Sequence, residues 1–301
     1  MMQYQGLVKL NGAIRVACCI AVVLLQLFTP LPASEDKSHG LLWEISKPGI
    51  KPAYLFGTIH SEDPEVLQLP QPVQQAIDRS HTVVLEMLLD TEAMMYSSTA
   101  MLMMDGRLLS DITGKALFRQ AASAIRSRDI PEVVLERMKP WAAAVILSMP
   151  ASETGLVLDM MLYQSALQQG KSVHGLETVQ EQLNVFEALP EKNQVLLLQD
   201  AVDNFSGLDA MHSELLDAYK QRDLAGLMAL NEASMHTGDQ SLAAEFQQHL
   251  VVDRNHRMSE RMQVYLRQGQ VFIAVGALHL PGEEGLLNLL EQQGFTVRRL
   301  Y

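Results

Sequence analysis

Two histidines stand in the same short motif near opposite ends of the sequence. His60 closes the run Gly57-Thr58-Ile59-His60, and His279 closes the run Gly276-Ala277-Leu278-His279. The glycine of each motif permits a tight turn or a close backbone approach. Neutral imidazole binds zinc, manganese or cobalt, and a third, acidic ligand would leave one coordination position open for water. A lone histidine after a strand is typically structural, but the repeated motif favours a divalent-metal site formed by both.

Two glutamates at the ends of apolar segments are candidates to complete this site. Glu86 closes the apolar segment that begins at Thr82, and Glu177 follows the short segment 172–175. A charged side chain at the end of an apolar strand is unfavourable unless it meets a cation or a hydrogen-bond partner. We therefore predict Glu86, and secondarily Glu177, as a metal ligand or a general base. The structural alternative for both is a salt bridge at the rim of the sheet.

Each histidine motif lies within a predicted strand–helix–strand unit. Apolar runs of four to six residues with β-branched side chains are typical of a parallel sheet covered on both faces. Ligands bind beyond the carboxyl ends of such strands, which is where both histidines fall. If the two units pair about a pseudo-twofold axis, their imidazoles converge. The predicted strands are 52–56 and 82–87 in the first unit and 271–275 and 295–297 in the second, with helices at 72–79 and from Pro281 to Gly294.

The ends of the helix expected after Pro281 carry suitable residues. Glu283 and Glu284 would lie in its first turn, near the positive end of the helix dipole. Gly294 is suited to a left-handed C-terminal cap.

Between the two units the sequence is mostly helical. One short strand is expected at 172–175, and the alternating segment 41–45 predicts a hairpin with the first core strand. The fold class is therefore α/β, or mixed α+β, with a central mixed β-sheet that holds both units and is surrounded by many helices. We expect residues 34–301 to form a single domain with a helical middle insertion at about 91–268. Helices are expected at 92–104, 113–127, 131–147, 155–169, 179–188, 191–203, 209–220, 223–235 and 241–268.

Five short segments, in this order and spacing, resemble one known family. They are Leu41-Leu42-Trp43-Glu44-Ile45-Ser46-Lys47-Pro48, Tyr54-Leu55-Phe56-Gly57-Thr58-Ile59-His60, Gly175-Leu176-Glu177-Thr178, Asp253-Arg254-Asn255 and Val275-Gly276-Ala277-Leu278-His279-Leu280-Pro281-Gly282. They are similar to the TraB/GumN family, which includes the TIKI proteases and the pheromone-shutdown proteins and is related to the erythromycin esterase and ChaN-like folds. The resemblance covers roughly residues 40–301.

The resemblance implies a mixed sheet wrapped by helices, with both histidine motifs at one active site. TIKI-like members are metal-dependent peptidases that cut near the N-terminus of secreted signalling proteins. On this resemblance His60 and His279 match the paired histidines. Other motif positions around the pocket are matched by Glu86, Glu177, Arg254 and Asn255. By pattern alone, the last two would belong to a solvated face of a long helix.

The N-terminus has the features of an export signal. Lys9 and Arg15 precede an apolar run from Val16 to Phe28, and small residues follow at Ala33-Ser34. The run is shorter than the roughly 20 residues that span a bilayer as a helix, so we predict a cleaved signal peptide at residues 1–33. The alternative is an uncleaved N-terminal membrane anchor. The mature protein would be periplasmic or secreted, with no further membrane span.

Composition excludes several classes of function. The chain of 301 residues carries 23 Lys and Arg against 35 Asp and Glu, a net charge of −12 that repels the phosphates of nucleic acids. Both cysteines, Cys18 and Cys19, lie in the predicted signal, so the mature chain would contain no thiol nucleophile and no Cys-ligated zinc. The H-E-x-x-H, G-x-S-x-G and phosphate-loop motifs are also absent.

These observations predict a secreted or periplasmic metal-dependent hydrolase, with a peptidase favoured, that acts on a peptide or small molecule. The ion, zinc, manganese or cobalt, would be held by His60, His279 and Glu86 and would activate water. A carboxylate would take the proton, and Arg254 would steady the oxyanion. One alternative is a non-catalytic protein that sequesters a peptide or another ligand, and a second is a metal-independent esterase that uses His60 and Glu86. The oligomeric state is left open.

Overall fold

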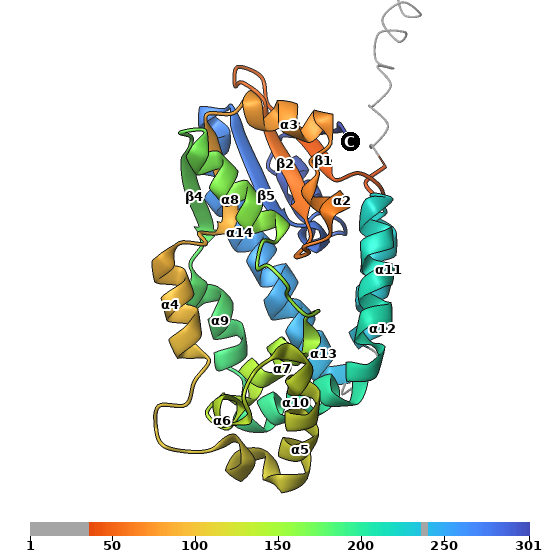
Figure 1. Ribbon diagram of the computed structural model, residues 1–301. Coiled ribbons are helices and arrows are strands. Elements are labelled where there is room, and N and C mark those ends of the chain that lie inside the picture. The colour runs from red at the N-terminus through yellow and green to blue at the C-terminus, as the bar shows by residue number, and fades with distance from the viewer. Residues whose placement is uncertain (1–35, 236–239) are drawn as a thin grey trace, which may run out of the picture. The chain divides into compact units, whose positions relative to one another are not determined.

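The computed structural model, which describes residues 36–235 and 240–301, contains a six-stranded mixed sheet (Figure 1). Its strands are β1 (Leu42–Ser46), β2 (Ala53–Thr58), β3 (Thr82–Met87), β4 (Ser172–Glu177), β5 (Val271–Gly276) and β6 (Thr296–Arg299). They are ordered β4-β3-β5-β2-β1-β6. The first four of these run parallel, and β1 runs antiparallel between β2 and β6. The predicted mixed sheet and the hairpin of β1 with β2 are confirmed, but the hairpin does not lie at the edge of the sheet, because β6 pairs with the other side of β1.

The two histidine motifs start on neighbouring strands. β2 and β5 are paired in parallel, with Gly57 beside Val275 and Thr58 beside Gly276. The strand that follows β2 in the chain is β3, which lies on the far side of β5. The strand that follows β5 is β6, which lies on the far side of β2 and β1. Strands whose connections leave in opposite directions define a topological switch point, beyond whose carboxyl ends α/β proteins bind ligands. Parallel pairing therefore brings the two motifs to one place.

The inner parallel strands β2 and β5 are buried because helices pack against the sheet. Every residue of β2 is buried, as expected for a strand covered on both faces. Helix α8 (Leu158–Gln168) contacts β3 and β4, and helix α14 (Asp253–Gln268) contacts β4 and β5. α14 contributes Met258, Met262 and Leu266 to the core of the sheet. These two helices lie in the segment predicted as an insertion, which also supplies β4.

A second hydrophobic cluster lies among helices of the middle segment. It is formed by α5 (Leu109–Ile125), α6 (Glu132–Leu135), α7 (Pro140–Ser148) and α10 (Glu191–Asn204). The other α-helices of the described residues are α2 (Pro64–Leu67), α3 (Gln71–Asp78), α4 (Thr91–Ala100), α9 (Val179–Glu187), α11 (Leu208–Lys220), α12 (Leu224–Met235), α13 (Gln240–Gln247) and α15 (Leu286–Gln292). Of the helices in residues 36–235 and 240–301, none is both long and apolar enough to cross a membrane. The predicted signal peptide, residues 1–33, lies outside these ranges.

Two predicted helices differ from the structure. The segment 131–147 forms two helices because Pro140, which lacks an N–H donor, starts the second one. The helix after Pro281 begins only at Leu286, so the prediction that Glu283 and Glu284 lie in its first turn is wrong. They belong to a loop that contacts α14. The predicted cap at Gly294 is confirmed, with φ of +82° and an N–H that donates to the Glu291 carbonyl.

The glycine of the first motif is required by close packing against the second. A Cβ atom at Gly57 would lie 2.8 Å from Leu280 Cδ1 and 3.1 Å from Ala277 Cα. Gly57→Ala is therefore expected to lower the free energy of unfolding by about 1–3 kcal/mol, measured in urea. Gly207→Ala is the control, because a Cβ atom there meets nothing within 4 Å, and its effect should stay within about 0.5 kcal/mol. Equal effects of the two substitutions would contradict this packing argument.

Candidate functional site

The carboxyl ends of the parallel strands bring most of the predicted site residues into direct contact. Glu86 is the last residue but one of β3, Glu177 ends β4, and His279 follows β5 in a short 3₁₀ helix, Ala277–His279. Arg254 and Asn255 reach these residues from α14. His60 follows β2 at the same edge, but its ion-pair contact is with a different residue, Asp159.

Helix α14 carries Arg254 on the row of side chains that faces the sheet. Arg254, Met258, Met262 and Leu266 follow one another at intervals of four, and all four are buried. Residues four apart share one face of a helix. A π-helical turn, Gln248–Val252, immediately precedes this helix, a distortion that is frequent at functional sites. The alternative of a solvated face at Arg254 and Asn255 is therefore wrong, because both residues are buried, and for Arg254 the spacing of four was the signal.

Glu86 lies at the centre of the contacts. Its Oε1 atom is 2.7 Å from Arg254 Nη2 and 3.0 Å from His279 Nε2. Burial would raise the pKa of Glu86, but the charges of His279 and Arg254 and the backbone N–H of Gly276 outweigh it and lower this pKa to about 2. A carboxylate with so low a pKa is a weak proton acceptor at neutral pH. Its environment suits an anionic ligand better than a general base.

Glu177 is fully buried, with 0% of its side chain exposed, and it holds Arg254 from the other side. Its Oε2 accepts a hydrogen bond from Arg254 Nε at 2.8 Å, and its Oε1 lies 3.0 Å from Arg257 Nε. Burial would lower the pKa of Arg254, but the charges of Glu86 and Glu177 raise it. Arg254 thus joins two carboxylates through different nitrogens of its guanidinium. This leaves Glu177 in contact with Arg254 rather than with solvent.

Asn255 determines which nitrogen of His279 carries a proton. Its Nδ2 atom donates to the backbone carbonyl of Glu284 at 2.8 Å, so its Oδ1 atom must face His279 Nδ1, 2.7 Å away. An amide oxygen only accepts hydrogen bonds, and Nδ1 is therefore the protonated nitrogen. In the neutral ring this leaves the lone pair of Nε2 directed toward Glu86. Metal-binding histidines are commonly oriented by a bond of this kind from the other ring nitrogen.

His60 has a more open environment than His279. Its side chain is 58% exposed, against 8% for His279, and its Nδ1 lies 4.0 Å from Asp159 Oδ2. Thr58, the second residue of the same motif, donates from Oγ1 to Asp159 Oδ1 at 2.7 Å. Burial and the charge of Glu86 raise the pKa of Asp159, although the Thr58 bond and His60 lower it. The sequence prediction missed Asp159, whose only signal was a charge among the apolar residues that begin α8.

The donor atoms fit a divalent ion in their chemistry. The Asn255 bond leaves His279 Nε2 free to donate a lone pair, and Glu86 presents an ionised oxygen to it. Imidazole nitrogen and carboxylate oxygen are ligands that zinc, manganese and cobalt accept. Across residues 36–235 and 240–301, however, no group of three or more His, Cys, Asp or Glu side chains is arranged to hold a metal. The ligand set of His60, His279 and Glu86 therefore stays a prediction.

The bond from Asn255 to His279 can be tested by metal binding. Asn255→Ala should weaken the affinity for Mn²⁺ or Zn²⁺ about 10- to 100-fold, because the imidazole loses the acceptor that orients it. Isothermal titration calorimetry measures this affinity. Asn288→Ala is a matched control, since Asn288 Nδ2 donates to the Glu283 carbonyl of the same loop at 2.8 Å without contacting the histidine. An equal loss in both variants would show that the loop, and not the imidazole, is responsible.

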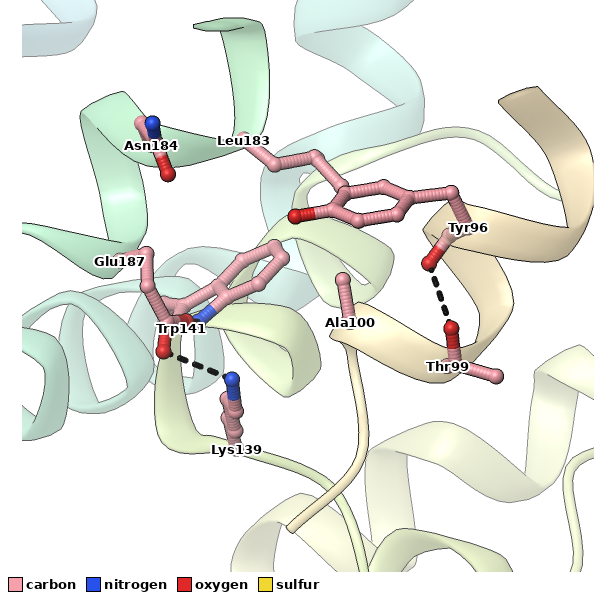
Figure 2. A pocket seen from close by; sticks show the side chains of 8 residues that line it. All are labelled: Tyr96, Thr99, Ala100, Lys139, Trp141, Leu183, Asn184 and Glu187. Atoms are coloured by element: carbon pink, nitrogen blue, oxygen red, sulfur yellow. Dashed lines mark hydrogen bonds and ion pairs between the residues drawn. The ribbon is translucent and has the colours of Figure 1, made fainter. Parts of the chain in front are cut away.

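A pocket of about 210 Å³ lies between α4, α7 and α9 (Figure 2). Figure 2 shows the ring of Tyr96 facing Leu183 across it. On the other side, Glu187 accepts hydrogen bonds from Trp141 Nε1 at 2.8 Å and from Lys139 Nζ at 2.7 Å. No predicted site residue lines this pocket. It is therefore not the candidate reaction centre.

Comparison with known proteins places the chain among related sequences. The model of the TraB/PrgY/gumN family matches residues 41–299. The chain is 25% identical to "Metalloprotease TIKI2" of Danio rerio, over 88% of this chain and 62% of that protein. It is 26% identical to "Metalloprotease TIKI2" of Xenopus tropicalis, over 89% and 61%, and 24% identical to "Uncharacterized protein YbaP" of Shigella flexneri, over 82% and 90%. The chain thus spans about three fifths of the length of the two metalloproteases. No solved structure matches it.

Proposed function

This chain belongs to the TraB/PrgY/gumN family, and from that premise we propose that it is a metal-dependent hydrolase that cleaves peptides. Two of its relatives are named metalloproteases. The observation that carries the proposal is the contact of His279 Nε2 with Glu86 at the switch point of the sheet, with the imidazole oriented through Nδ1 by Asn255. Peptides are the substrate class that the names of these relatives support.

In this proposal each residue has a defined task. His60, His279 and Glu86 hold the ion, which, when bound, polarises the scissile carbonyl and lowers the pKa of a bound water. Glu86 acts as a ligand rather than a base because Arg254 holds its carboxylate in the ionised form. Arg254 orients Glu86, since both of its contacts with carboxylates are already made inside the protein. Glu177 and Asn255 position Arg254 and His279, respectively.

The test combines elemental analysis with a peptide-library digest. Protein purified without a metal-affinity column should contain about one divalent ion per chain, and it should cleave peptides until a chelator is added. Intact peptides after prolonged incubation with metal-loaded protein would favour the sequestering alternative. Turnover that is insensitive to chelators would favour the metal-independent esterase that uses His60 and Glu86.

We propose further that the protein is exported to the periplasm or secreted, as the basic and apolar N-terminus suggests. N-terminal sequencing of the protein recovered from an extracytoplasmic fraction is expected to begin at Ser34, with residues 34–301 as the mature domain. An N-terminus that begins at Met1 in the membrane fraction would indicate the uncleaved anchor instead.

A further inference from the structure

A further pocket, of about 480 Å³, lies between α4, α8 and the loop that connects α7 to α8. Its volume falls within the range of about 300–1,000 Å³ that is usual for ligand sites, whereas the pocket of Figure 2 is smaller than that. Its apolar lining is formed by Leu89, Met94, Leu156, Met160 and Tyr163. The pocket therefore has the size and the surface to hold an apolar group of a ligand.

The course of the chain places this pocket close to the candidate site. Leu89 follows Glu86 by three residues, so their Cα atoms are at most about 11 Å apart. Met160 directly follows Asp159, and their Cα atoms are therefore about 3.8 Å apart. Tyr163 is four residues after Asp159, and residues four apart share one face of a helix. One wall of the pocket is thus continuous with the helix face that carries Asp159.

The connecting loop, another wall of the pocket, is held by a residue that stands two positions after the first histidine motif. This residue, Glu62, accepts five hydrogen bonds from the loop. The donors are the hydroxyls of Ser152 and Thr154 and the backbone N–H groups of Glu153, Thr154 and Gly155. The Ser152 hydroxyl and the Thr154 N–H lower the pKa of Glu62 to about 2, so the carboxylate holds the loop at neutral pH. The wall is therefore formed before any ligand binds, as is usual for ligand pockets.

The lining residues favour a neutral, apolar occupant. Met94 is 50% exposed, and the flexible side chain of methionine adapts to apolar groups of different shapes. Among the lining residues, all of which belong to the described part of the chain, none is lysine or arginine, and Asp90 is acidic. A carboxylate on the ligand would lose water here without meeting a cation, whereas the burial of an apolar side chain is favourable.

From these features we propose that the pocket binds an apolar side chain of the peptide substrate, of the size of leucine, methionine or phenylalanine. The inference rests on the proposed function and specifies its substrate class. An extended peptide advances about 3.3 Å per residue. The bound side chain therefore lies within about three residues of a scissile bond that is cleaved beside Glu86, and acidic side chains are disfavoured at that position.

The test is a peptide-library digest by the full, metal-loaded chain, in which Met94→Trp is compared with Met95→Trp. Both methionines are exposed on α4, but of the two only Met94 lines the pocket. The wild type and Met95→Trp should cleave peptides with an apolar residue at one fixed position about tenfold faster than peptides with alanine there. Met94→Trp fills the pocket, and it should remove this preference without slowing the cleavage of the alanine peptides.

Binding to the metal-free chain gives a readout that does not require turnover. The probes are three fluorescein-labelled glycine–serine peptides with a central leucine, alanine or aspartate. Fluorescence anisotropy should show that the leucine peptide binds about tenfold more tightly than the alanine peptide, and that the aspartate peptide binds most weakly. Met160→Trp fills the pocket from α8 and should abolish the difference between leucine and alanine. Circular dichroism establishes that each variant is folded.

The outcomes separate this inference from the proposed function. A wild type that cleaves peptides without an apolar preference would overturn the inference alone, and so would a preference that persists in folded Met94→Trp or is lost equally in Met95→Trp. Selective binding of the leucine peptide, without cleavage in the presence of any metal, would support the pocket and overturn the proposed hydrolysis. A wild type that neither binds nor cleaves the peptides would overturn both.

Discussion

Replacement of His279 by alanine is expected to reduce metal-dependent peptide hydrolysis on the order of 10³-fold or more in kcat/KM. The metal supplies several kcal/mol of transition-state stabilisation, and each 1.36 kcal/mol corresponds to about tenfold in rate. The substitution removes the Nε2 atom that lies 3.0 Å from Glu86, and it leaves the Asn255 oxygen without its partner. The rates are measured on a substrate found in the library digest, at saturating Mn²⁺ or Zn²⁺ and after chelation.

Two comparisons make this prediction specific. Chelation of the wild type should reproduce the loss and added metal should reverse it, whereas added metal should not rescue His279→Ala. His81→Ala is the control, because this histidine is exposed at the start of β3, away from the carboxyl ends of the strands, and activity should not change. Full activity of a metal-free His60→Ala variant would refute the shared metal site.

The second large effect is expected on stability. Arg254→Met preserves much of the side-chain volume but leaves Glu86 and Glu177 without their shared cation. Removal of one partner from a buried ion pair lowers the free energy of unfolding by about 3–5 kcal/mol, and here Glu86 would keep only His279 and Glu177 only Arg257 as positively charged neighbours. We expect a loss of this size in urea unfolding at pH 7. The control is Arg261→Met on the same helix, whose partner is Glu181 and whose side chain is 41% exposed, where the loss should be below about 1 kcal/mol.

The decrease in the free energy of unfolding caused by Arg254→Met should also depend on pH. The pKa of Glu86 is about 2 in the folded protein, below its ordinary value of 4.5. The stabilisation from this shift is therefore present above about pH 5 and disappears as the pH falls toward 2. The difference in stability between the wild type and the variant should shrink over the same interval. A difference that is constant down to pH 2 would show that Arg254 stabilises the protein by packing rather than by charge.

Much of the secondary structure followed from local patterns. The segment 82–87 is β3 as predicted, because a short apolar run with β-branched side chains is favourable only in a covered strand. The helix end at Gly294 also matched, since this glycine acts through its own backbone conformation. The loop around Glu284 was mispredicted because its conformation depends on α14. His256 Nε2 lies 2.7 Å from the Glu284 carboxylate, and Asn255 binds the carbonyl of the same residue.

The sequence by itself determined that the two Gly-x-x-His motifs follow buried strands and that Glu86 lies at the end of another buried strand. It could do so because strand periodicity and glycine spacing are local properties. Only the tertiary structure decided which of these residues meet. Arg254 contacts Glu86, which is 168 residues away in the sequence, and Thr58 contacts Asp159, which is 101 residues away. Such contacts depend on how α14 and α8 pack against the sheet, and a charged residue on a helix looks the same in sequence whether it is solvated or buried against a carboxylate.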